Sequence, residues 1–283
     1  VTIAHDLTLN GTVSNAPTSV TVNSGKSLTF GSSGTITVST LTITGTLNMT
    51  SGGTLTMAAS GTFTNNGTFT RGVGTINFAG AGTINGSVAS TFNNLTINTG
   101  ALTLTTVPTI DGTLRINGGY VAQAPKYSSN STLFYNSSYN RSNEWNATGV
   151  GTIGTTAGYP NHVTINTGTF SVLNADAGTA RAMAGDLTIA SGATFTTGAL
   201  NALVTVGGNI INNGTVTMST STGRVKCSNF TNNNGATTTL SSSVGGDLEL
   251  TGSLIDNATF NANTRAVFFS GTGVQDVSGS GTS

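Results

Sequence analysis

Short apolar triplets, each with two apolar residues flanking one polar residue, recur roughly every six to nine residues along most of the chain. In one representative stretch they are 41–43, 47–49, 55–57 and 76–78, separated by turns of Gly, Ser and Asn. Because alternate side chains of a β-strand face opposite ways, each triplet directs two apolar groups inward and its polar residue outward. The spacing leaves no room for a helix, so the pattern predicts an all-β stack of short strands, a β-solenoid.

Internal repeats indicate how this stack is built. Residues 66–78 align without a gap on 257–269, and residues 95–104 align on 163–172. One such repeat cannot bury an apolar face alone and must stack on its neighbours, which predicts a parallel β-helix. The general preference for right-handed crossovers predicts a right-handed coil. Asn-rich turns such as 65–67 are typical of sharp corners, and stacked coils would align such Asn side chains in hydrogen-bonded ladders.

One segment, 118–160, interrupts the pattern and contains all five Tyr and the only Trp. We therefore expect three parts: a first solenoid array over 1–117, an aromatic-rich insertion or loop excursion over 118–160, and a second array over 161–283. The final residues resemble 79–90, a point at which the first array continues. This likeness predicts that the second array continues beyond residue 283.

Composition excludes several classes of function. Only 6% of the residues are charged and the formal net charge is zero, which argues against nucleic-acid binding or a polybasic membrane patch. The single cysteine, Cys227, excludes an internal disulfide framework and a Cys-based zinc site. His5 and His162 have no second ligand at metal-binding spacing, and no apolar run is long enough for membrane insertion. We expect no metal and no cofactor.

Acidic residues are scattered singly, apart from Asp247 and Glu249, which lie two positions apart. That pair is interpreted as a solvated patch rather than a cation site. Because an enzyme needs a convergent set of reactive groups, the scatter predicts that the protein is not an enzyme and has no catalytic residues.

Two features remain as candidates for binding. Aromatic and acidic side chains of the insertion could form a sugar-stacking platform for surface glycans, although packing of the insertion against the solenoid is the favoured interpretation. The platform candidates are Tyr120, Tyr127, Tyr135, Tyr139, Glu144, Trp145 and Tyr159. Outward Thr-x-Thr pairs, such as Thr194 with Thr196, resemble the ice-binding faces of solenoid antifreeze proteins, but their irregular spacing departs from that pattern.

Residues 91–100, 144–165, 181–195 and 245–282 resemble repeat modules of very large secreted surface proteins of Bacteroidetes-type bacteria, which are exported by the type IX secretion route. The resemblance implies an extracellular, cell-surface location and a structural or adhesive role. It supplies no functional residues that could be carried over to this chain.

Our first hypothesis is therefore a non-catalytic structural or adhesive β-solenoid that forms a rigid stalk, fibre or matrix element of a bacterial surface. Open solenoid ends carry unpaired strand edges, so we expect association end to end with other copies or with the rest of a longer chain. The alternatives are a carbohydrate-binding adhesin module that uses the aromatic insertion, and ice binding through the Thr-x-Thr rows.

Overall fold

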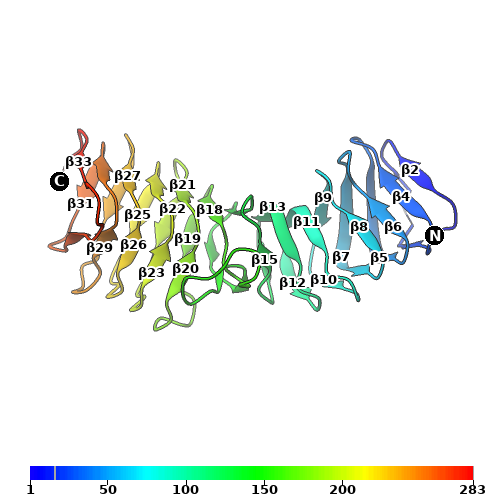
Figure 1. Cartoon of the computed structure of the whole chain (residues 1–283), viewed down its shortest axis with the longest axis horizontal. Helices are drawn as coiled ribbons and strands as arrows, with labels where there is room; N and C mark the ends of the chain where they lie inside the picture. Colours follow the sequence, from blue (N-terminus) through cyan, green and yellow to red (C-terminus); the bar gives the residue numbers. More distant parts are fainter. Residues whose placement is uncertain (16, 283) are drawn as a thin grey trace. The chain divides into compact units, whose positions relative to one another are not determined.

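The computed structural model describes residues 1–15 and 17–282, and nearly all of its regular structure is parallel β-strand (Figure 1). The strands stack as a β-solenoid of about 13 turns over the described residues, which confirms the predicted fold class. The chain divides into two compact units, unit 1 over Val1–Ser131 and unit 2 over Thr132–Ser283. In the described part of the chain, no helix is long and apolar enough to cross a membrane.

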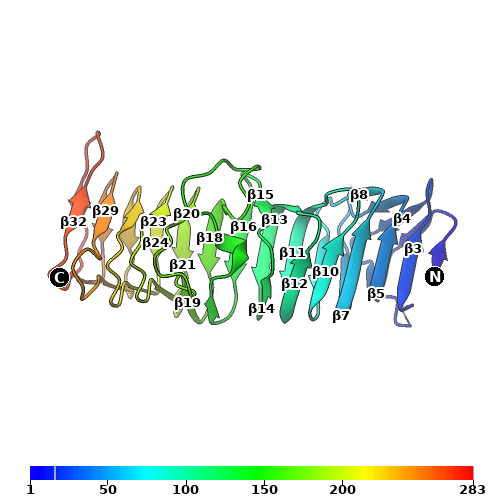
Figure 2. The same cartoon turned by 90° about the horizontal axis from the view of Figure 1, so that it is seen from below.

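Unit 1 consists of three parallel stacks, and Figure 2 shows β3, β5 and β7 side by side in the first. The first stack holds β1 (Thr2–Ile3), β3 (Ser19–Val22), the second halves of β5 (Thr35–Ile43) and β7 (Thr54–Asn65), β10 (Gly82–Asn85), β12 (Gly100–Leu104) and β14 (Gly119–Val121). The second holds β2 (Leu7–Leu9), β4 (Ser27–Phe30), β6 (Thr46–Asn48) and β8 (Thr68–Thr70). The third holds the first halves of β5 and β7, then β9 (Thr75–Phe78) and the second halves of β11 (Thr91–Ile97) and β13 (Thr109–Ile116). The first halves of β11 and β13 pair with each other, and that of β13 pairs with β15 (Lys126–Tyr127).

Unit 2 also has three stacks, and Figure 1 shows β19, β22 and β25 side by side in one of them. One stack holds β16 (Thr132–Tyr135), β18 (His162–Ile165), β21 (Leu187–Ile189), β24 (Ile210–Asn212), β27 (Phe230–Asn232), β30 (Leu254–Asp256) and β33 (Val277–Ser278). Another holds β17 (Tyr139–Asn140), β19 (Thr169–Ser171), β22 (Thr194–Thr196), β25 (Thr215–Thr217), β28 (Thr237–Thr239) and β31 (Thr259–Asn261). The last holds β20 (Arg181–Met183), β23 (Val204–Val206), β26 (Val225–Cys227), β29 (Leu248–Leu250) and β32 (Val267–Phe269).

Alternation of inward and outward residues along each strand produces the core, as the sequence predicts. In β22 and β25 the central Phe195 and Val216 are buried, whereas the flanking threonines are half-buried on the outer face. In unit 1, the inward rings of Phe63, Phe69 and Phe92 lie 5.4–5.5 Å apart, centroid to centroid. Edge-to-face and tilted contacts of this kind stabilise beyond the area they bury.

Amide ladders run from coil to coil, as the Asn-rich turns predict. In unit 1, Nδ2 of Asn98 donates to Oδ1 of Asn77 at 2.7 Å, and Nδ2 of Asn117 donates to Oδ1 of Asn98 at 2.8 Å. In unit 2, Nδ2 of Asn212 donates to Oδ1 of Asn232 at 2.9 Å, and both side chains are fully buried. A buried amide is costly unless its donors and acceptors are paired, and the ladder pairs them.

The segment predicted as an insertion, 118–160, differs from the expectation in part. Strands β14 and β15 pair with the preceding coils of unit 1, and β16 and β17 pair with the following coils of unit 2. Aromatic residues suit a pleated, half-buried strand, so Tyr127 and Tyr135 occupy inward strand positions as readily as Leu or Ile. Only the chain after β17 departs from the stack.

That departure expands one coil. Thr132 pairs with His162, 30 positions later, whereas partners in later coils of unit 2 are separated by 19 positions (Leu248 with Val267) to 25 (Thr169 with Thr194), counted from their residue numbers. The added residues form the short 3-10 helix η1 (Asn143–Trp145) and a loop over 147–158. Backbone amides of Asn146 and Ala147 close the loop by donating to the carbonyl of Gly158, each at 2.9 Å.

Candidate functional site

The seven predicted platform residues divide between the two units. Tyr120 and Tyr127 belong to unit 1, where Tyr120 is 45% exposed and Tyr127 is fully buried. The other five, from Tyr135 to Tyr159, belong to the expanded coil of unit 2.

Within the expanded coil the aromatic side chains pack into the core. The ring centroid of Tyr135 lies 4.2 Å from that of Phe170, and the Trp145 ring stacks on the same Phe170 at 5.8 Å. Neither Tyr135 nor Trp145 has any exposed surface, and Tyr159 is 4% exposed. Nε1 of Trp145 donates to the carbonyl of Ala182 at 2.9 Å. Because a stacking platform must offer open ring faces, a glycan contact through these residues stays a prediction.

Glu144 is fully buried beneath this aromatic cluster. Its Oε1 accepts hydrogen bonds from the Tyr135 hydroxyl at 2.9 Å and from the Ser142 amide at 2.8 Å, and its Oε2 accepts one from the Tyr139 hydroxyl at 3.3 Å. Burial raises the pKa of the Glu144 carboxyl, an effect opposed by the Ser142 and Glu144 amides, the Tyr135 hydroxyl and the charge of Arg141. The carboxyl is thus satisfied within the coil rather than directed at solvent.

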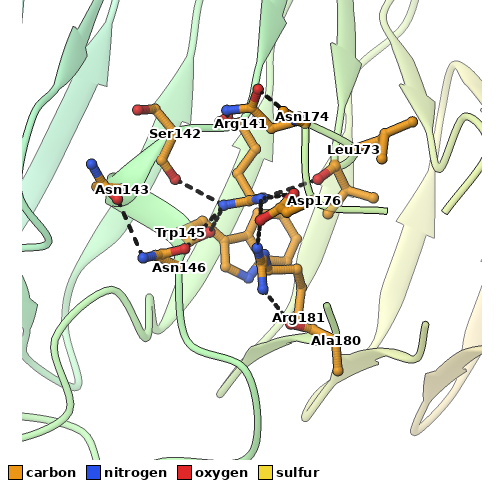
Figure 3. Close-up of polar contacts among 12 residues, drawn as sticks. Arg141, Ser142, Asn143, Trp145, Asn146, Leu173, Asn174, Asp176, Ala180 and Arg181 are labelled. Carbon is orange, nitrogen blue, oxygen red and sulfur yellow. Dashed lines mark hydrogen bonds and ion pairs between the residues drawn. The ribbon is translucent and has the colours of Figure 1, made fainter. Parts of the chain in front are cut away.

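Arg141 is the centre of a second polar group, shown in Figure 3. Its side chain is 2% exposed, and its Nε donates to the carbonyl of Val172 at 2.9 Å. Its Nη1 donates to the carbonyls of Ser142 and Trp145, both at 3.1 Å, so three backbone carbonyls fix the plane of the guanidinium. Its Nη2 lies 2.7 Å from each carboxylate oxygen of Asp176. Burial lowers the pKa of the Arg141 guanidinium.

Arg181 meets the same carboxylate from the other side (Figure 3). Its Nη2 pairs with Oδ2 of Asp176, and its Nη1 donates to the carbonyl of Ala180 at 2.6 Å. Arg181 is also 2% exposed, and among the described residues its buried Nε has no acceptor. Burial and the neighbouring charge of Arg141 lower the pKa of Arg181 to about 10, so it remains charged at neutral pH.

The cluster of Arg141, Asp176 and Arg181 was not predicted from the sequence. One signal was present in the sequence. Arg181 is the first residue of its strand, and the residues at the same position in the next two coils are Val204 and Val225. A charged residue at an inward position of a repeated triplet indicates a buried polar site, because an unpaired buried charge is strongly unfavourable. The partner Asp176 lies in the irregular loop between β19 and β20, where the triplet pattern predicts nothing.

Asp247 and Glu249, interpreted from the sequence as a solvated acidic patch, have separate partners. Asp247 accepts the backbone amide of Ala266 at 2.9 Å. Glu249 pairs with Arg224 at 2.7 Å and with Lys226 at 2.8 Å. The coil register places Lys226 directly opposite Glu249 on the neighbouring strand, which distance along the sequence does not show. These side-chain bonds, Lys226 first and then Arg224, lower the pKa of Glu249 to about 2.

This shift predicts a measurable pH dependence. Because the folded-state pKa of Glu249 lies below its ordinary value of 4.5, the carboxylate stabilises the fold above pH 4.5. The stabilisation is lost progressively as the pH falls from 4.5 to about 2. Urea unfolding of wild type and Glu249→Gln, measured from pH 7 to pH 2.5, is expected to show a smaller acid-induced loss of stability in the variant. Parallel curves would contradict the assignment.

Nδ1 of His162 accepts the amide of Asp186 at 3.1 Å and lies 3.7 Å from Oδ2 of the same residue. Among the described residues, no three His, Cys, Asp or Glu side chains lie together in a way that could hold a metal ion. Burial raises the pKa of the Cys227 thiol to about 12, which keeps it protonated and unreactive at neutral pH.

Comparison with known proteins gives no assignment: no protein-family model, no curated protein and no solved structure matches the chain. The likeness to secreted Bacteroidetes-type surface repeats therefore stays a prediction from the sequence.

Proposed function

We propose that this protein is a non-catalytic extracellular β-solenoid that serves as a structural or adhesive element of a bacterial surface, extended by further coils that stack on its ends. The proposal takes its location from the family resemblance and its mode of assembly from the two end coils. The observation that carries it is the apolar interior that these coils leave open.

At the N-terminal coil, the interior opens as an apolar pocket of about 160 Å³. Val1 is 67% exposed and Leu7 is 42% exposed, although Leu7 pairs in register with Leu28, and both Leu28 and the next residue of this inward column, Leu47, are buried. The residues that line this pocket are Val1, Ile3, Leu7, Leu9, Val13, Pro17, Val20, Leu28 and Ile36.

At the C-terminal coil, exposed apolar side chains again stand at the end of a stack. Phe269 and Val277 are 40% and 67% exposed, although they follow the buried Leu250 and Leu254 in register. Among the described residues, β32 and β33 each pair with one neighbouring strand. An unpaired strand edge above an apolar face is a template for another strand. Because both ends carry parallel strands, a coil of another copy, or of the rest of a longer chain, can continue the ladder head to tail. Between copies, such heterologous contacts generate filaments.

A charge placed in the N-terminal pocket tests this assembly. Leu7→Lys is expected to abolish concentration-dependent growth in sedimentation velocity, because stacking would bury an unpaired ammonium. The matched control is Val150→Lys, which introduces the same charge at a loop position that is 77% exposed. Self-association that persists in Leu7→Lys, or that Val150→Lys abolishes equally, would contradict end-to-end stacking.

A second candidate function, ice binding, is favoured by the register of one face in unit 2. The outward residues of β19, β22, β25, β28 and β31 stand in two straight columns, although partners in successive coils are 21 (Thr194 with Thr215) to 25 (Thr169 with Thr194) positions apart. The loops between these strands accommodate the differences in coil length. The irregular spacing of the Thr-x-Thr pairs along the sequence therefore does not disturb the two columns. The columns are Thr169, Thr194, Thr215, Thr237 and Thr259, and Ser171, Thr196, Thr217, Thr239 and Asn261.

Thermal hysteresis tests this second candidate. If the Thr columns bind ice, a solution of the wild-type protein is expected to freeze below its melting point. Thr215→Lys is expected to remove most of this gap between the two temperatures. Thr188→Lys, on the neighbouring stack of β21, is expected to leave the gap unchanged. Ordinary crystal growth in the presence of wild type rules the candidate out.

A further inference from the structure

The Arg141–Asp176–Arg181 cluster has the features of a ligand site rather than of an ordinary core contact. Both arginine side chains are 2% exposed in unit 2. Arg181 pairs in register with the apolar Val204 of the following coil, and Arg141 directly follows Asn140, which pairs with Ser171, the residue before Val172. Well-packed apolar residues are often as stabilising as a buried ion pair, so stability alone does not explain two buried arginines.

The geometry of the guanidinium groups is fixed before any ligand arrives. Backbone carbonyls hold Nε and Nη1 of Arg141, and the carbonyl of Ala180 holds Nη1 of Arg181. Both side chains thereby direct Nη2 at a single point, where the carboxylate of Asp176 lies (Figure 3). The buried Nε of Arg181 lacks an acceptor among the described residues. The two arginines therefore offer more hydrogen-bond donors than the Asp176 carboxylate accepts.

Asp176 reaches this point from the surface. It lies in the irregular segment 173–180 between β19 and β20, and its side chain is 34% exposed. The segment is held by a few polar contacts: Asn174 Nδ2 donates to the Arg141 carbonyl at 2.8 Å, and the Asn201 amide donates to the Ala177 carbonyl at 2.9 Å. The partly exposed carboxylate of Asp176 thus occupies the position at which the two buried arginines concentrate positive charge.

We propose that Arg141 and Arg181 form an oxyanion-binding site that Asp176 occupies as a tethered ligand, and that the carboxylate or sulfate groups of an acidic polysaccharide displace Asp176 from it. Guanidinium groups match the paired oxygens of these anions and bind them through two parallel hydrogen bonds. Displacement moves the segment 173–180 outward and gives the external anion the Nη2 donors that Asp176 held. The cluster carries two cationic side chains for one loop carboxylate, so the site selects anionic over neutral glycans.

Removal of the tethered carboxylate provides the first test, with sulfate and acetate as probes in calorimetry at matched ionic strength. Asp176→Ala is expected to bind both anions saturably and at least tenfold more tightly than wild type, because the internal competitor is gone. Asp186→Ala is the matched control, since this aspartate of unit 2 is 35% exposed and has no arginine partner among the described residues. Arg181→Gln added to Asp176→Ala is expected to abolish binding. No saturable binding by Asp176→Ala, or equal binding by Asp186→Ala, would overturn the proposal.

A second test uses wild type and does not depend on the folding of any variant. Oligogalacturonate supplies carboxylates, dextran sulfate supplies sulfate esters, and neutral dextran is the control. Because displaced Asp176 releases the loop, either acidic glycan is expected to speed hydrogen exchange at the Asn201 amide, which bonds the Ala177 carbonyl, and neutral dextran is not. Binding of one acidic glycan alone identifies which anion the site accepts. Unchanged exchange with both acidic glycans would overturn displacement.

Discussion

Arg141→Ala is expected to lower the free energy of unfolding of unit 2 by about 3–5 kcal/mol, because it breaks a buried ion pair and leaves its partner uncompensated. The substitution also leaves the carbonyls of Val172 and Trp145 without the donors that they have in the folded protein. Each buried acceptor left unpaired adds a cost of about 1–3 kcal/mol if water cannot reach it. Chemical unfolding followed by tryptophan fluorescence reports this loss, since the only Trp, Trp145, lies in the same coil.

Arg71→Ala is the matched control. Arg71 pairs with Asp111 in unit 1, but the two side chains are 34% and 20% exposed. A solvent-accessible pair contributes only about 0–1 kcal/mol, so the control is expected to change stability little. A cost for Arg141→Ala no larger than that for Arg71→Ala would show that the buried cluster does not hold the expanded coil together.

Gly86→Ala is expected to cost about 2–6 kcal/mol, the sum of backbone strain and overpacking. Gly86 follows β10 with a φ of +121°, a conformation that side chains with a Cβ rarely adopt. An added Cβ would also lie 2.5 Å from the carbonyl carbon and 2.6 Å from the amide nitrogen of Asn65, in the preceding coil. Backbone atoms cannot swing aside as a flexible side chain can, so the two coils must separate and weaken the ladder between them.

Gly25→Ala distinguishes the two causes. Gly25 also has a positive φ, +71°, but no atom lies within 4 Å of the position its Cβ would take. Only the cost of a left-handed residue applies, about 1–2 kcal/mol. Urea unfolding of both variants measures the difference. Equal losses would mean that close stacking at the Asn65 corner contributes nothing to stability.

The repeated part of the fold was predictable because one local rule, alternation, acts at every coil. Leu55 and Met57 alternate with threonines, and the structure buries both while pairing their strand with the coils on either side. The Asn ladders followed from the same rule, because parallel stacking in register brings like residues together. The strands within 118–135 were harder to predict, because Tyr127 interrupts the apolar pattern of the sequence although it fills an inward strand position.

The ion cluster was not predictable in the same way. Arg141 and Asp176 are separated by 35 positions, and their meeting depends on the size of the expanded coil and on an irregular loop. Neither length follows from alternation. The pairing of Lys226 with Glu249 is similar, since it depends on a coil length of 23 positions that no local signal determines.

Both proposals treat the solenoid as a scaffold, with ends that join to further coils and one charged position that departs from the repeat. The repeat supplies rigidity because each interior coil of a unit pairs through parallel ladders with the coils on both sides, whereas the end coils and the segment 173–180 have fewer partners. Association and ligand exchange are therefore expected at these places, since the least supported elements of a structure open most easily.

Electron microscopy of the native material, at a resolution that shows single particles, tests the central claim most directly. End-to-end stacking predicts continuous filaments with a fixed axial repeat, and the Leu7→Lys variant is expected to give short separate particles under the same conditions. Wild-type particles that stay separate at all concentrations, with the same length distribution as Leu7→Lys, would contradict it.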